Sequence, residues 1–188
     1  MIKALGSKID LSQPDTEYNQ MVCDLISHEV VCQMKNYIQH GRTTTFQHCV
    51  NVSYYNYLIC KLLSLDARAA ARGGLLHDLF LYDWHTRVTP VGEHNHAIAH
   101  AGTALTNAKM YFALDEKETD IIKKHMFPVN PALPKYSETV VITIVDKVCG
   151  VMEVLDYRRW EIKALARHFR YIRYVKGLER NAVRAVEE

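Results

Sequence analysis

Hydrophobic positions recur at helical spacing in almost every segment of the chain. Between residues 18 and 38 apolar side chains return every three or four residues, and Pro14-Asp15-Thr16-Glu17 just before them is a typical helix start. This pattern predicts an N-terminal helix over about residues 15–40, with Gly41 as the residue that follows its end. No segment of useful length alternates with the strand period, although Val140–Val145 is compatible with either a helix or a strand.

Capping residues predict where further helices begin. Thr44 precedes Gln47, and Asp115 precedes Glu118, each at the three-residue spacing of a capping box. Asp66 stands just before a short alanine-rich segment. The predicted helices cover about residues 44–64, 66–78, 95–112, 115–125, 137–148 and 158–186. We therefore expect an all-α fold, a single-domain helical bundle over residues 1–188 in which the helices at 15–40 and 158–186 pack on a core of about 42–150.

Length and composition narrow the class of protein. The chain has 188 residues and a net charge of +2, which suits one soluble globular domain and argues against binding polyanions over its whole surface. No run approaches the roughly 18 apolar residues of a membrane helix, and the start is too short for a signal peptide. The cysteines are odd in number and never spaced C-x-x-C, so we expect buried, reduced thiols and a cytoplasmic location. They are Cys23, Cys32, Cys49, Cys60 and Cys149.

The adjacent pair His77-Asp78 is the strongest chemical signal, because every neighbour from Gly73 to Phe80 is apolar or glycine. Polar groups at the edge of such a run need a partner. Either the two side chains hydrogen bond to each other, or both bind a metal ion that His48 and Asp146 also bind. Two imidazoles and two carboxylates suit Fe, Mn, Ni, Co or Mg better than a structural zinc site, and an octahedral ion would keep positions open for water and substrate.

At these residues the chain resembles the HD superfamily of metal-dependent phosphohydrolases. The family pattern H…HD…D falls on His48, His77-Asp78 and Asp146, and the flanking residues are also similar to the family's. The similar segments are Thr45–Val52, Ala71–Asp78 and Val145–Cys149, within a region of about 42–150. The resemblance implies hydrolysis of a phosphate mono- or diester by metal-activated water, with a nucleotide or a related small molecule as the expected substrate.

Two further histidines extend the resemblance to members with a two-metal site. His100 and His125 occupy intermediate positions that imply a second ion, with Asp78 bridging the two. One departure matters: many members carry a lysine three residues after the HD pair, where this chain has Leu81. The role of that lysine would pass to Lys147, to Arg42 or to the second metal ion.

Several polar residues outside the ligand set are candidates for catalysis or substrate binding. Asp83 and His85 lie in the predicted loop after the HD pair and could act as general acid or base. Arg42, before a helix N-terminus, and Lys147 could bind phosphate, and His96 could share a helix face with His100. For each the alternative is a solvated side chain, which is also what we expect of the remaining histidines. These are His28, His40, His94 and His168.

The segment 158–186 is basic and carries an apolar stripe. It could be a solvated helix face, a nucleic-acid surface or the contact of a homodimer.

Two other functions are also compatible with an HD scaffold, namely a non-catalytic nucleotide or metal sensor and a di-iron oxygenase.

Overall fold

The computed structural model describes residues 8–10, 16–86 and 96–187, and its contacts group the chain into two compact units, Met1–Glu153 and Val154–Glu188. The elements are α1 (Thr16–Ile26), α2 (Glu29–Cys32), the 3-10 helix η1 (Gln33–Asn36), β1 (Ile38–His40), β2 (Thr43–Thr44), α3 (Thr45–Leu62), α4 (Ala67–Leu76), α5 (His96–Tyr111), α6 (Glu116–Lys124) and α7 (Ser137–Glu187). The predicted all-α class is confirmed. The packing of the C-terminal helix on the core stays a prediction.

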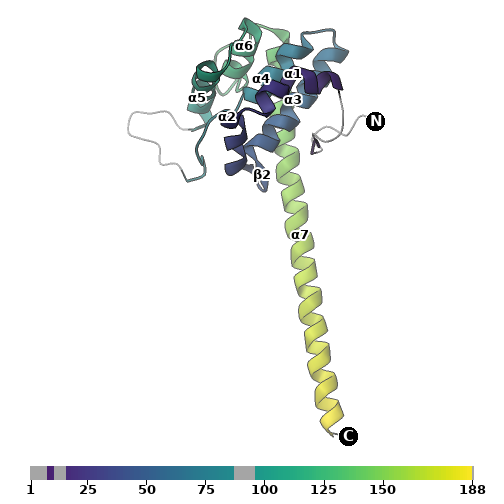
Figure 1. Ribbon diagram of the computed structural model, residues 1–188. Coiled ribbons are helices and arrows are strands. Elements are labelled where there is room, and N and C mark those ends of the chain that lie inside the picture. Colours follow the sequence, from purple (N-terminus) through teal and green to yellow (C-terminus); the bar gives the residue numbers. More distant parts are fainter. Residues whose placement is uncertain (1–7, 11–15, 87–95, 188) are drawn as a thin grey trace. The chain divides into compact units, whose positions relative to one another are not determined.

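Helix α3 is the centre of the first unit, because residues on all its faces are buried. Helix α4 packs along α3 and also contacts α1 and α6, while α5 packs on α6, as Figure 1 shows. The approach of α4 to α3 is close: a Cβ added to Gly74 would lie 2.8 Å from the Cα of Ser53 in α3. Only glycine fits there, and this close contact holds the C-terminal end of α4 in place.

The predicted helix over 15–40 is wrong. Helix α1 ends at Ile26, and the next polar residues hydrogen bond to the backbone: Ser27 Oγ donates to the Cys23 carbonyl at 2.7 Å, and His28 Nδ1 accepts from the Val30 N–H at 3.2 Å. Such side-chain bonds compete with helix continuation. The chain then forms the antiparallel hairpin β1–β2, and Gly41, at φ 57°, occupies its turn instead of a helix end.

The predicted capping residues are confirmed. Thr44 and Asp66 each accept a hydrogen bond from the N–H three residues on, at 3.2 and 3.0 Å. Asp115 and Glu118 form a complete capping box, with distances of 2.7 and 3.1 Å between each side chain and the other residue's N–H. These local signals start α3, α4 and α6 at the expected residues.

Two helices predicted separately, over 137–148 and 158–186, form the single helix α7. No proline lies between them, and the one glycine, Gly150, costs about 1 kcal/mol relative to alanine, which is too small to end a helix. Val140–Val145 belongs to this helix, which settles the helix–strand ambiguity of that segment.

The predicted burial of the cysteines is confirmed for three of the five. All five cysteines are free thiols, and Cys49, Cys60 and Cys149 are buried, whereas Cys23 is exposed and Cys32 half-buried. Within the described part of the chain, no helix combines the length and apolar character needed to span a membrane.

Candidate metal centre

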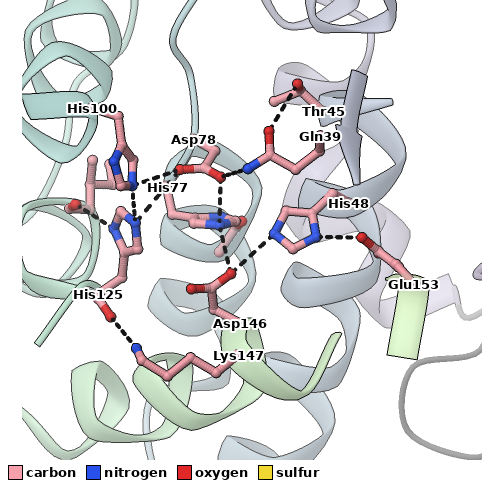
Figure 2. Close-up of polar contacts among 12 residues, drawn as sticks. Gln39, Thr45, His48, His77, Asp78, His100, His125, Asp146, Lys147 and Glu153 are labelled. Carbon is pink, nitrogen blue, oxygen red and sulfur yellow. Dashed lines mark hydrogen bonds and ion pairs between the residues drawn. The ribbon is translucent and has the colours of Figure 1, made fainter. Parts of the chain in front are cut away.

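The structure brings six of the predicted side chains together inside the first unit, from five different helices (Figure 2). They are His48 from α3, His77 and Asp78 from the end of α4, His100 from α5, His125 from the C-cap of α6 and Asp146 from α7. All are buried except Asp146, whose side chain is 13% exposed. Helix ends and faces far apart in sequence thus converge on one point, as in other helical metal sites.

Asp78 lies between two groups of these ligands. On one side, His77 Nε2 is 3.5 Å from Asp78 Oδ2 and 3.6 Å from Asp146 Oδ1, and His48 Nε2 is 3.1 Å from the same Asp146 oxygen. On the other side, Asp78 Oδ1 is 3.4 Å from His100 Nε2 and 3.6 Å from His125 Nε2. Oδ2 of Asp78 therefore faces His77, and Oδ1 faces His100 and His125, so the carboxylate has imidazoles on both of its sides.

Backbone carbonyls set the protonation of three of the imidazoles. His77, His100 and His125 each place Nδ1 within hydrogen-bond distance of a carbonyl oxygen, which can only accept. The carbonyls belong to Gly74, His96 and Ile122, at 2.8, 2.8 and 2.9 Å. Each Nδ1 therefore carries a proton, and in the neutral ring the lone pair lies on Nε2, directed at the centre.

The centre contains buried polar atoms that no hydrogen bond within the protein satisfies. His100 Nε2 and His125 Nε2 lie 3.0 Å apart, so two lone pairs face each other when both rings are neutral. His77 Nε2 and Asp78 Oδ1 are buried without a hydrogen-bond partner. An unsatisfied buried group costs about 1–3 kcal/mol. A divalent cation on each side of Asp78 would satisfy all four atoms, so the residues present fit a metal centre.

His48 is held differently, by carboxylates on both sides of its ring. Its Nδ1 is 2.9 Å from Glu153 Oε2, and the other Glu153 oxygen accepts from Asn51 Nδ2 at 2.9 Å. Burial opposes the charged ring, but the hydrogen bonds to Asp146 and Glu153 outweigh it and raise the pKa of His48 to about 10. A metal at Nε2 must displace a proton, and Glu153 would then orient the ring, as carboxylates do behind histidine ligands.

Burial also opposes the charged form of His77, but the carboxylates of Asp78 and Asp146 outweigh it and raise the pKa of His77 well above its usual value, so a metal at its Nε2 must displace a proton too. His125 and Asp146 already have the charge that metal binding requires. Burial, helped by the nearby His77, lowers the pKa of His125 to about 3 and keeps that ring neutral. Burial alone would raise the pKa of Asp146, but hydrogen bonds from His48 and His77 bring it well below its usual value. The carboxylate is therefore anionic at neutral pH.

Two residues that the sequence did not indicate support the centre. Gln39 in β1 donates from Nε2 to Asp78 Oδ2 at 2.7 Å, and its own Oε1 accepts from Thr45 Oγ1 at 3.2 Å. Glu153 is the second, and its position seven residues after Asp146 on a helix could have placed it on the same face. Nothing in the sequence marks Gln39, because the pattern around it predicted a helix.

His40 was expected to be a surface residue, and this expectation is wrong. Its ring is half-buried with its centroid 5.3 Å from that of His48, and ligand atoms of His40, His48 and Glu153 lie within 4.8 Å of one another. Burial lowers the pKa of His40. The β1–β2 hairpin, which the sequence pattern did not predict, places His40 beside His48.

The remaining predicted residues lie around the centre or outside it. Lys147 Nζ donates to the carbonyls of Thr143 and His125, at 3.0 and 3.4 Å, beside the ligands and not among them. His96 stacks on His100 with centroids 4.7 Å apart, and its Nδ1 is 3.0 Å from the Tyr82 hydroxyl. The predicted sharing of a face by His96 and His100 is therefore confirmed.

Arg42, Asp83 and His85 are exposed. Arg42 follows Gly41 in the hairpin turn. Asp83 and His85 pair with each other, with Oδ1 of Asp83 2.9 Å from the His85 N–H and 3.3 Å from its Nδ1. His94 lies outside the described residues.

The chain matches no protein-family model, no curated protein and no solved structure. The assignment of a candidate metal centre therefore depends on the convergence of the six side chains and on the unsatisfied acceptors between them.

Proposed function

We propose that the protein is a metal-dependent phosphohydrolase that cleaves a phosphate mono- or diester of a small molecule, a nucleotide or a related compound. The observation that carries this proposal is the position of Asp78, a buried carboxylate with Oδ2 toward His77 and Oδ1 toward His100 and His125. Sites that hold two cations side by side suit phosphate esters, because both the attacking and the leaving oxygen can be stabilised.

The proposed ligand sets follow from the distances. His48, His77, Asp78 and Asp146 would hold one cation, and Asp78, His100 and His125 the other. This mixture of imidazole and carboxylate favours Fe, Mn, Ni or Co, with Mg also compatible with the carboxylates. Bound cations supply Lewis-acid stabilisation of phosphoryl oxygens and a water of lowered pKa.

The chain's own residues would orient the Asp78 carboxylate and protonate the leaving oxygen of the substrate. Gln39 fixes the rotation of the Asp78 carboxylate, so that Oδ1 stays directed at His100 and His125. For protonation of the leaving oxygen, Asp83 is a poor donor: the hydrogen bond from the His85 N–H lowers its pKa, so it is charged at neutral pH. His85 or a water is therefore the better candidate, and Arg42, Lys147 and His96 remain proposed contacts for substrate.

The test combines metal analysis with activity. Purified wild-type protein is assayed for bound metals and for hydrolysis of a panel of phosphate esters, with and without oxygen. We expect Asp78→Ala to lose both cations and all turnover, because both sets share this residue. His125→Ala should lose only the second cation, and exposed Asp83→Ala, the matched control, should keep the metal content of wild type.

Each contrary result has a distinct meaning. Unchanged metal content and turnover in Asp78→Ala would refute the proposal. Oxygen uptake by the metal-loaded protein without ester hydrolysis would favour a di-iron oxygenase, and tight nucleotide binding without turnover would favour a sensor.

A further inference from the structure

The second unit, Val154–Glu188, exposes large apolar side chains on one face of α7. Leu155 is 46% exposed, Leu165 56%, and Ile162 and Phe169 each 66%. A helix gains most of its stability in water by burying such a face, so this stretch of α7 needs a partner.

The spacing of these residues identifies the kind of partner. They follow a seven-residue repeat, with Leu155, Ile162 and Phe169 at position a and Leu165 at position d. In the sequence the same register runs from Val141 to Ile172, and every a and d residue is apolar except Arg158 at one d position. A repeat of this length is typical of a coiled coil.

A strict seven-residue repeat distinguishes another helix from a flat lipid surface. On a straight helix the apolar stripe drifts by about 20° per heptad, so over four heptads it turns away from any plane. A second helix that coils with the first can follow the stripe along its whole length. The geometry therefore favours a helix as the partner over a membrane.

The charges of the stretch are compatible with a second copy of the same helix. Lys163, Arg167 and Arg170 lie at the b and f positions, which point away from the a/d stripe. Arg159 and Arg173 lie at e positions beside the stripe, and in a parallel pair they face g positions, which hold no lysine or arginine in the second unit. The one cation within the stripe, Arg158, already has a counterion: its Nη1 is 3.0 Å from Glu161 Oε2.

We propose that the protein forms a homodimer in which two copies of α7 pair through the stripe at Leu155, Ile162, Leu165 and Phe169. The pairing is isologous, because each copy offers the same surface to the other. It is independent of the metal centre, whose ligands all lie in the first unit.

The test is the mass of the full-length protein in solution, by light scattering and sedimentation across a concentration series. We expect wild type at twice the 21.7-kDa chain mass and Ile162→Glu/Phe169→Glu at the mass of one chain. The matched control, Ala164→Glu/Tyr171→Glu, adds the same two charges at the same spacing at position c, and should remain dimeric. Metal content should be equal in all three proteins, so failure of the dimer and failure of the metal site are separate results.

Three outcomes would overturn the proposal. The first is a wild type that is monomeric at every concentration. The second is an Ile162→Glu/Phe169→Glu protein that dimerises as well as the control. The third is a wild type of one-chain mass that co-sediments with phosphatidylserine vesicles, which would show that lipid is the partner.

Discussion

Replacing Gly74 by alanine should displace the proposed metal ligands through a clash between α4 and α3. The new Cβ would lie 2.8 Å from the Cα and 3.3 Å from the N of Ser53, both main-chain atoms of α3. Carbon atoms in contact prefer about 3.5–4.0 Å, so α4 must move away by up to about 1 Å. Because His77 and Asp78 directly follow α4, their distances to the ligands on α3, α5 and α6 would change by a similar amount.

The expected magnitude combines two opposing effects. Overpacking costs about 1–3 kcal/mol, and the exchange of glycine for alanine inside a helix returns about 0.5–1 kcal/mol. We expect a net loss of up to about 2.5 kcal/mol in the free energy of unfolding, measured by urea denaturation, together with weaker metal binding measured by calorimetric titration.

Gly102→Ala is the matched control, because Gly102 is also helical and lies two residues from the ligand His100. Its Cβ would meet nothing within 4 Å, so the free energy of unfolding of this variant should rise by about 0.5–1 kcal/mol. Its metal affinity should equal that of wild type. The reasoning fails if Gly74→Ala keeps wild-type stability and metal affinity, or if the two variants behave alike.

Three other predictions test the supporting contacts. Gln39→Leu should lower metal affinity by about 10–100-fold in the same titration while leaving the fold intact, because Asp78 loses the donor that orients it; an unchanged affinity would contradict this role. Arg72→Met should destabilise the protein by about 3–5 kcal/mol, because it leaves the buried Glu118 with only the longer 4.0 Å ion pair to Arg68 in place of the 2.9 Å bond from Arg72. Arg72→Met/Glu118→Gln should recover part of the loss on urea denaturation. Asp120 has a lowered pKa because bonds from Lys124 and backbone N–H groups outweigh its burial, so its contribution to stability is complete above pH 3.8 and disappears as the pH falls through its folded-state pKa. The difference in free energy of unfolding between wild type and Asp120→Asn should therefore shrink in acid. A constant difference down to pH 2 would contradict the stabilising role of the Asp120 carboxylate.

The helix starts and the ligand types could be predicted because they depend on short stretches of sequence. Thr44, Asp66 and Asp115 cap helices through bonds to residues three positions away, so their spacing alone is informative. His48, His77, Asp78 and Asp146 could be named because they stand in apolar contexts and match the HD pattern, and His100 and His125 only because of that resemblance. The long continuous α7 was predicted as two helices because its first part is apolar and its last part is basic.

What the sequence determined by itself was therefore local: an all-α chain, the caps of its helices and a set of candidate ligands. Only the tertiary structure decided how Gln39 and Glu153 support that set, why His40 is half-buried beside it, and that Asp78 has imidazoles on both sides of its carboxylate. Gln39 meets Asp78 across 39 residues and His48 meets Glu153 across 105. Such contacts depend on how helices and the hairpin pack, and no local spacing encodes them.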